Sequence, residues 1–232
     1  VRDTIIVTVG NTPVVNLGAD GSYCGTQMLV AGSGGDTYLW STAQTTASII
    51  VTLSGVYSVQ VTNTSGCMAS DTISLTILSS PSVDLGPDSM YCGSVVLVAG
   101  SGPDTYMWST MDTTASITVT TSGTYIVDVT NPSGCIDSDT IVITINALPG
   151  VSINGNATMC SGGSVTLTAS GADMYAWVNG PTTAANTVMP SADSTFWVVG
   201  MDMITGCSDS ASFMVTVIVA PIIMQSVTVC QG

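Results

Sequence analysis

Residues 49–77 read IIVTLSGVYSVQVTNTSGCMASDTISLTI, and the type of secondary structure can be inferred from this stretch. Apolar residues recur at every second position in three short runs, Ile49–Val51, Val56–Val61 and Thr72–Ile77. The runs are rich in β-branched residues and are bounded by Gly, Asn and Ser, which is typical of short strands separated by turns. Because no segment of the chain shows an apolar period of 3.6 residues with helix caps, we expect an all-β protein.

The same pattern recurs along the chain at an offset of about 68 residues. The matching pairs are Pro13/Pro81, Cys24/Cys92, Trp40/Trp108, Tyr57/Tyr125, Cys67/Cys135 and Asp71/Asp139. A third, more divergent copy starts at Pro149, keeps Cys160 in register, and slips before Trp177 and Cys207. The predicted boundaries are 1–12 for the last strand of a preceding repeat, 13–80, 81–148 and 149–220 for repeats 1, 2 and 3, and 221–232 for the start of a following repeat.

Each repeat has room for six to seven short strands, which predicts a small β-sandwich. A Tyr-x-Trp motif places Trp40, Trp108 and Trp177 between the two cysteines of each copy, with an immunoglobulin-like (Ig-like) spacing. We expect these rings to pack between two sheets; the alternative is an aromatic ligand platform. The predicted fold class is therefore all-β, with tandem Ig-like β-sandwich repeats of about 68 residues.

The composition excludes several classes of function. The chain has one Lys or Arg, which is Arg2, and fifteen acids, all of them Asp, so its net charge is −14. Without His, Glu or Lys it lacks the usual acid–base and nucleophile partners, and we expect no enzyme activity. Nucleic acid would be repelled by this charge. No stretch approaches the roughly 18 consecutive apolar residues of a membrane-spanning helix.

Seven regularly placed cysteines predict structural disulfides in an oxidising, extracytoplasmic setting, because no zinc-ligand spacing competes. We favour pairing within each repeat, as Cys24–Cys67, Cys92–Cys135 and Cys160–Cys207. Cys230 would then be left for a partner beyond this sequence. If each repeat has seven antiparallel strands, its two cysteines lie at opposite ends and the pairs become Cys24–Cys135 and Cys92–Cys207.

Residues 84–140 carry a resemblance to a known family. The motifs Asp-Leu-Gly-Pro-Asp, Tyr-Cys-Gly, Tyr-Met-Trp-Ser-Thr, Ser-Gly-Thr-Tyr-Ile-Val-Asp-Val and Gly-Cys-Ile-Asp-Ser-Asp-Thr follow one another in this stretch. This run resembles the Ig-like, PKD-like repeats of very large bacterial surface and secreted proteins. The resemblance implies a stalk of an adhesin, exported by the type IX secretion route, and it says little about a ligand.

The aspartates recur by position and sit beside Gly, Ser or Pro. We expect most of them to cap turns with their own side chains. The sharper hypothesis is Ca²⁺ at domain junctions, since hard oxygen ligands are the one metal chemistry that this composition offers. The candidate ligands are Asp20, Asp36, Asp88 and Asp104, although no D-x-D-x-D-G loop is present.

A second short motif, Asp followed by Ser or Thr and then a small or apolar residue, occurs seven times. It resembles the O-glycosylation motif of bacteria that carry such repeats. The candidate acceptors are Thr4, Thr72, Ser89, Thr113, Thr140, Ser194 and Ser210. We place Thr72 and Thr140 first because they recur at the same position of two repeats.

The leading functional hypothesis is an extracellular stalk or filament segment whose partners are neighbouring repeats or other copies in a fibre. Short linkers that end at Pro81 and Pro149 favour it, because proline limits bending. One alternative is a module that binds carbohydrate or a protein partner, most favoured in repeat 3, which carries the extra aromatic pair Phe196-Trp197. Another alternative is a filament assembled by strand exchange between subunits.

Overall fold

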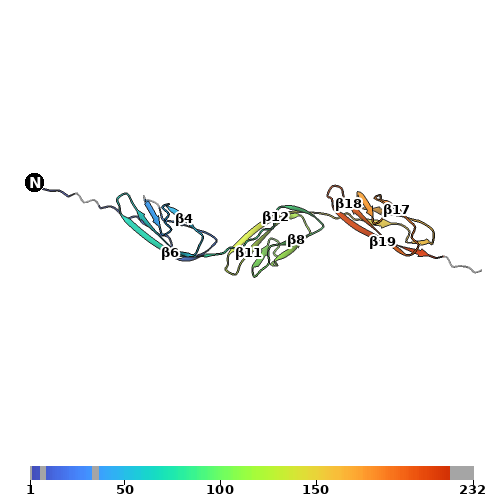
Figure 1. The fold of residues 1–232 in the computed structure, drawn as a ribbon, viewed down its shortest axis with the longest axis horizontal. Coiled ribbons are helices and arrows are strands. Elements are labelled where there is room, and N and C mark those ends of the chain that lie inside the picture. Colours follow the sequence, from blue (N-terminus) through green and yellow to red (C-terminus); the bar gives the residue numbers. More distant parts are fainter. Residues whose placement is uncertain (1, 6–8, 33–36, 220–232) are drawn as a thin grey trace, which may run out of the picture. The chain divides into compact units, whose positions relative to one another are not determined.

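The computed structural model describes residues 2–5, 9–32 and 37–219, and within these ranges the regular structure consists of strands, with no helix. The strands fall into three successive β-sandwiches that follow the predicted repeats (Figure 1). Repeats 1 and 2 have six strands each and repeat 3 has seven, as predicted. The chain is therefore a tandem of Ig-like β-sandwich domains.

Repeat 1 contains two sheets, one of four strands in the order β1-β6-β5-β3 and one of two strands, β2-β4. Their inward-facing residues alternate with exposed ones, as the period of two in the sequence requires. The strands are β1 (Gly21–Cys24), β2 (Gln27–Val30), β3 (Thr37–Trp40), β4 (Ser48–Val51), β5 (Gly55–Thr62) and β6 (Met68–Leu78).

Repeat 2 reproduces this arrangement, with sheets β7-β12-β11-β9 and β10-β8. Its strands are β7 (Ser89–Cys92), β8 (Val95–Val98), β9 (Thr105–Trp108), β10 (Ser116–Val119), β11 (Gly123–Thr130) and β12 (Ile136–Asn146). The last strand has the same length and the same burial pattern as β6, so the repetition in sequence is also a repetition in structure.

Repeat 3 adds one short strand, β13, to its smaller sheet, which has the order β13-β15-β17 beside the larger sheet β14-β19-β18-β16. Its strands are β13 (Ser152–Asn154), β14 (Thr158–Cys160), β15 (Val165–Ser170), β16 (Met174–Trp177), β17 (Ala185–Val188), β18 (Ser194–Met201) and β19 (Ser208–Ile218). The divergence of its sequence therefore leaves the sandwich intact.

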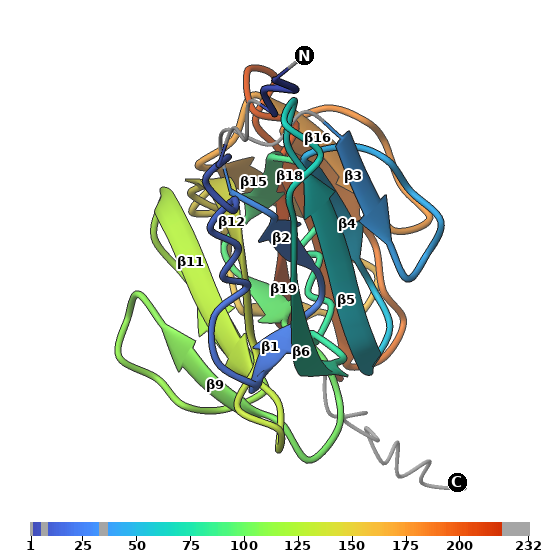
Figure 2. The same cartoon turned by 90° about the vertical axis from the view of Figure 1, so that its left-hand side faces the viewer.

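The first strand of each larger sheet runs parallel to the last strand, while the other strand pairs of repeats 1 and 3 are antiparallel. β1 pairs with the end of β6, so that Cys24 lies opposite Leu78, and β7 pairs with β12, with Cys92 opposite Asn146. Figure 2 shows β3, β5 and β6 of repeat 1 next to one another, with β1 beside β6. The first cysteine of a repeat thus lies at the carboxyl end of its last strand.

Each repeat has its own core, built around one tryptophan. Trp40, Trp108 and Trp177 are buried, and each indole N–H donates to the main-chain oxygen of the threonine six residues later. The hydrogen bond satisfies the ring's polar atom inside an apolar core. The prediction that these rings pack between the sheets is confirmed, and the alternative of an aromatic platform at Trp40, Trp108 and Trp177 is wrong.

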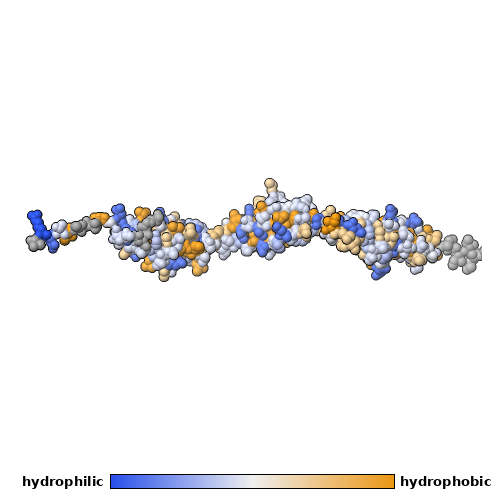
Figure 3. Space-filling model, turned by 90° about the horizontal axis from the view of Figure 1, so that it is seen from above, coloured by the Kyte–Doolittle hydropathy of each residue, from blue (hydrophilic) through white to orange (hydrophobic). Residues whose placement is uncertain are grey.

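The surface carries apolar side chains among polar ones (Figure 3). Met28, Ile50, Val96 and Met107 point outward from strands and are about half exposed or more. The mean hydropathy of +0.53 therefore reflects exposed apolar residues as well as the absence of Lys and Glu.

The predicted first and last segments, 1–12 and 221–232, lie outside the three sandwiches. Residues 2–5 and 9–20 carry no strand, and residues 6–8 lie outside the described ranges. The following repeat predicted for 221–232, which includes Cys230, also lies outside them. The exact repeat boundaries stay predictions.

Candidate functional site

Two disulfides join each repeat to the next one. Cys24 of repeat 1 bonds to Cys135 of repeat 2, and Cys92 of repeat 2 bonds to Cys207 of repeat 3. The Cα atoms are 5.6 Å apart in both bridges, within the range that an S–S bond spans. These junctions are the candidate functional site, because they convert three separate sandwiches into one covalently cross-linked unit.

Our preferred pairing within repeats, Cys24–Cys67, Cys92–Cys135 and Cys160–Cys207, is therefore wrong, and the alternative pairs are found. The reason is the parallel first strand. Cys24 lies beside Leu78 at the end of β6, while Cys67 directly precedes the start of that 11-residue strand. At about 3.3 Å per residue the two cysteines are roughly 36 Å apart, far beyond the reach of a disulfide.

The sequence prediction allowed cysteine pairing between repeats only if each repeat had seven antiparallel strands, and this condition is wrong. Repeats 1 and 2 have six strands each, and their cysteines still pair across the junction. A parallel strand has the same effect as one additional antiparallel crossing, because both place the first cysteine at the end of the sheet opposite the second.

A tight loop positions the second cysteine of repeat 2. The side-chain oxygen of Asn131 accepts hydrogen bonds from the main-chain N–H groups of Ser133 and Cys135, each at 3.0 Å. The amide nitrogen of Asn131 donates to the carbonyl oxygen of Ser79 in the linker from repeat 1, at 2.7 Å. One side chain therefore fixes the loop that carries Cys135 and ties it to the linker.

Repeat 1 contains the same loop around Cys67. Asn63 accepts from the N–H groups of Ser65 and Cys67, and its amide nitrogen donates to the carbonyl oxygen of Asn11 at 2.6 Å. Sequence reasoning missed these two asparagines. The repeated motif Asn-x-Ser-Gly-Cys, at residues 63–67 and 131–135, is the signal that could have identified them.

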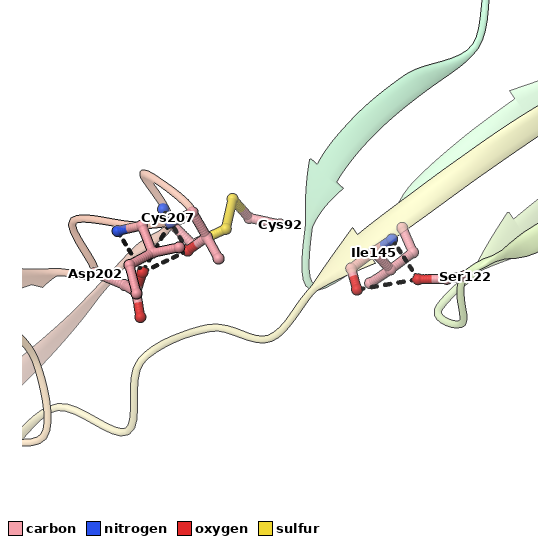
Figure 4. Close-up of a disulfide and its surroundings, with 7 residues drawn as sticks. Cys92, Ser122, Ile145, Asp202 and Cys207 are labelled. Atoms are coloured by element: carbon pink, nitrogen blue, oxygen red, sulfur yellow. Dashed lines mark hydrogen bonds between the residues drawn. A yellow bond between two sulfur atoms is a disulfide. The ribbon is translucent and has the colours of Figure 1, made fainter.

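In repeat 3 an aspartate takes this role (Figure 4). One carboxylate oxygen of Asp202 accepts from the N–H groups of Ile204 and Thr205 and from the Thr205 hydroxyl, and the Thr205 hydroxyl accepts from the N–H of Cys207. Donation by the main chain and the side chain of Thr205, followed by Ile204, holds the pKa of Asp202 below its usual range despite an opposing effect of desolvation. The junction to repeat 3 is therefore organised by a charged group.

The other side of that junction is braced by a serine. The Ser122 hydroxyl oxygen accepts from the N–H of Ile145 at 2.9 Å and donates to its carbonyl oxygen at 3.3 Å (Figure 4). Ile145 lies on β12 opposite Tyr91, the residue before the bridging Cys92. Ser54 makes the same pair of hydrogen bonds to Ile77 in repeat 1, so both bridging strands are held in the same way.

Two further cysteines have free thiols: Cys67 is half-buried and Cys160 is exposed. By position, Cys67 is equivalent to the bridged Cys135, and Cys160 is equivalent to the bridged Cys24 and Cys92. Cys230 lies outside the described residues.

Two of the four candidate calcium ligands, Asp20 and Asp88, accept hydrogen bonds from the main chain. Asp20 accepts from the N–H of Ser74 and Asp88 from that of Val142, so both tie the segment before the first strand to the last strand. Asp104 is half-buried, and Asp36 lies outside the described residues. Within the described ranges no group of three or more His, Cys, Asp or Glu is placed to hold a metal ion. The calcium hypothesis stays a prediction.

Asp71 is another structural acceptor in repeat 1. Its carboxylate accepts from the N–H of Leu17 at 2.7 Å and from that of Thr72 at 2.8 Å. These two donors, Leu17 first, lower the pKa of Asp71 against a small opposing effect of desolvation. Because Asp139 contacts Leu85 and Thr140 in the same way, the recurrence of these aspartates has a structural cause.

The candidate O-glycosylation residues divide into two groups by exposure. Five of them are exposed, namely Thr4, Thr72, Thr113, Thr140 and Ser210. Ser89 and Ser194 are half-buried, and their hydroxyls donate to the main-chain oxygens of Pro87 and Ala192. The exposed group is therefore better suited to modification, and modification itself stays a prediction.

The described part of the chain contains no helix long and apolar enough to cross a membrane. No protein-family model and no curated protein sequence matches this chain.

Solved structures with a similar arrangement are tandem Ig-domain proteins. They include Sidekick-1 immunoglobulin domains 1–5 (11% identity, TM-score 0.29), the titin I-band fragment I67–I69 (10%, 0.29) and the insect immune protein hemolin (11%, 0.30). The alignments cover 87%, 88% and 89% of this chain, and 58%, 96% and 76% of the respective structures. The chain thus spans little more than half of the Sidekick-1 fragment. At these scores the likenesses carry no argument about ligands or partners.

Proposed function

We propose that this chain is a structural segment of an extracellular surface protein and that it resists stretching. The observation that carries the proposal is the covalent link from each repeat to the next, through Cys24–Cys135 and Cys92–Cys207. Disulfides persist mainly in oxidising compartments outside the cytosol, which supports a surface or secreted location. The resemblance of residues 84–140 to bacterial adhesin repeats favours the stalk of such a protein.

The two bridges overlap along the chain, and this has a mechanical consequence. The shortest covalent path from Cys24 to Cys207 crosses one bridge to Cys135, runs back to Cys92, and crosses the second bridge. That path contains about 40 residues, against about 180 along the backbone. A fully extended residue spans up to about 3.6 Å, so the bridges limit the stretched length to roughly 150 Å instead of roughly 650 Å. A segment built this way can be drawn out only to this limit, even if its sandwiches unfold.

Single-molecule force spectroscopy tests this function directly, with the chain held at its two ends. We expect the extended length between Cys24 and Cys207 to increase about fourfold on reduction. The double variant Cys92→Ser/Cys207→Ser keeps one bridge and should reach an intermediate length of roughly 250 Å, set by the residues from Cys135 to Cys207. The matched control Cys67→Ser/Cys160→Ser, which removes only free thiols, should behave like the parent chain. Equal lengths for oxidised and reduced protein would contradict the proposal.

Location needs a separate measurement. Antibodies against the sandwich domains should label intact cells of the source organism, and non-reducing peptide mapping of the native protein should recover the Cys24–Cys135 and Cys92–Cys207 pairs. Reduced cysteines in freshly extracted protein would argue against an extracellular role.

A further inference from the structure

Repeat 3 contains a cavity of about 620 Å³ between the loop after β16, strand β17 and the start of β18. Its lining includes Asn179, Asn186, Thr187, Ser194 and Trp197. Repeat 1 has a hollow of about 290 Å³ in the equivalent place, so the repeat 3 cavity is about twice as large. The larger volume falls in the range of small-molecule sites, which is roughly 300 to 1,000 Å³.

The residue that distinguishes this cavity is Asn186. It lies on β17 opposite Leu167, which is the position that Ile49 occupies opposite Leu29 in repeat 1 and that Ile117 occupies in repeat 2. Asn186 is only 8% exposed, close to the 3% of Ile49 and the 7% of Ile117. The sandwich thus accommodates an apolar residue here twice and a polar one once.

The Asn186 side chain has no hydrogen-bond partner in the part of the chain that the structure describes, and it lines the cavity. The nitrogen and oxygen of this amide are not fully buried, so they reach the cavity. Because isoleucine packs at this position in repeats 1 and 2, the packing of the core does not explain why repeat 3 has asparagine there. An amide that reaches a cavity and has no partner in the described part of the chain is available to a hydrogen-bonding ligand.

The second distinguishing residue is Trp197. Phe196 packs against the repeat 3 core, in the position of Tyr57 and Tyr125, whereas Trp197 points to the other face and is 50% exposed. The equivalent positions in repeats 1 and 2 hold Ser58 and Ile126. Repeat 3 therefore presents an indole where the other repeats present a small hydroxyl or an aliphatic side chain.

The chemistry of the lining indicates the class of ligand. None of the residues that line the cavity is charged, although the chain as a whole carries −14. The lining includes Asn179, Asn186 and the half-exposed Trp197. It also includes Thr187 and Ser194, whose hydroxyls hydrogen-bond to the Thr166 hydroxyl and to the Ala192 carbonyl oxygen and keep a lone pair for a further donor. Amides and hydroxyls bind the hydroxyl groups of a neutral sugar, and an indole offers a flat apolar surface for the sugar's C–H face. We propose that this cavity binds a neutral saccharide.

Isothermal titration calorimetry of the oxidised chain tests the proposal, with a panel of neutral hexasaccharides composed of glucose, mannose, galactose or N-acetylglucosamine. We expect at least one of them to bind with a millimolar or tighter Kd. Asn186→Ile should weaken that binding at least tenfold while keeping the sandwich folded, because isoleucine occupies this position in repeats 1 and 2. Trp197→Ser, which copies repeat 1, should weaken it to a similar extent.

The matched control is Ser58→Ala in repeat 1, which changes the equivalent position of another sandwich and should leave binding unchanged. Far-ultraviolet circular dichroism and hydrogen exchange of β17 and β18 verify the fold of each variant. Three outcomes would overturn the proposal: no binding by any of the saccharides at millimolar concentration, equal binding by the parent chain and both cavity variants, or binding of extended peptides in place of sugars. Because the cavity lies within repeat 3, these outcomes are independent of the force measurements on the bridges.

Discussion

All three repeats share one fold, but repeat 3 differs from repeats 1 and 2 at a few positions. All three pack a buried tryptophan between the sheets and start the larger sheet with a strand parallel to the last one. Repeat 3 alone places Asn186 in the core, exposes Trp197, and organises its cysteine loop with Asp202. Positions that the three copies share are therefore needed for the sandwich and its bridges, and positions that differ are available for another function.

The largest effect is expected from exchanging the core residues of the two kinds of repeat. Ile49→Asn in repeat 1 should cost about 3 to 5 kcal/mol, because it loses apolar burial and adds an unpaired amide. The reverse change, Asn186→Ile, should leave the stability of repeat 3 unchanged or raise it, because isoleucine occupies this core position in repeats 1 and 2. Hydrogen exchange followed by mass spectrometry gives the opening free energy of each sandwich. A loss of stability in both variants would mean that Asn186 is part of the fold.

The cysteine loops give the next comparison. Asn131→Ala removes two accepted hydrogen bonds and the one donated to Ser79, and it should cost repeat 2 about 1 to 2 kcal/mol. The Cys24–Cys135 bridge should also be reduced faster by a dithiol, measured by quenched alkylation. Asn63→Ala is the control, because it weakens the equivalent loop around the unbridged Cys67 and should leave that rate unchanged.

Two tyrosines at the same position allow a smaller test. The buried hydroxyl of Tyr106 in repeat 2 has no partner among the described residues, whereas that of Tyr175 in repeat 3 donates to the carbonyl oxygen of Ala172 at 2.6 Å. Tyr175→Phe should therefore cost about 1 kcal/mol, and Tyr106→Phe should be neutral or stabilising by up to about 1 kcal/mol. Thermal unfolding of the two variants measures the difference, and an equal cost at both sites would contradict it.

The smallest expected effect is the loss of local stability around Asp202 at acidic pH. The pKa of Asp202 is lower in the folded protein than in the unfolded one, so its contribution to stability is present above the unfolded pKa and is lost as the pH falls through the folded pKa. Below pH 4 the loop 202–207 should exchange its amide hydrogens faster, relative to the loops 63–67 and 131–135, where neutral asparagines do not titrate. Asp202→Asn should remove this difference, and a parent loop that stays unchanged below pH 4 would show that the charge has no role.

Much of the fold could be predicted from residue order. The alternation in 49–77 predicted strands, the repeat period predicted separate sandwiches, and the Tyr-x-Trp motif predicted a core ring in each of them. These features depend on neighbours close in sequence, since strand periodicity and turn residues act locally.

The candidate site was less accessible to such reasoning. The cysteines pointed to disulfides, but their pairing depends on where β1 and β7 join their sheets, and no local pattern distinguishes a parallel first strand from an antiparallel one. The aromatic pair Phe196-Trp197 favoured repeat 3 as a binding module. Only the pleat of β18 shows that the Phe196 ring faces the core and that the Trp197 ring faces solvent.

Sequence alone was enough to infer an all-β tandem repeat with few charged residues and seven cysteines, because composition, period and alternation are properties of the chain. The tertiary structure decided that Cys24 meets Cys135 and Cys92 meets Cys207, and that Asn186 lies buried where isoleucine serves the other repeats. These facts concern residues distant along the chain, and what brings such residues together is the pairing of strands and the packing of sheets.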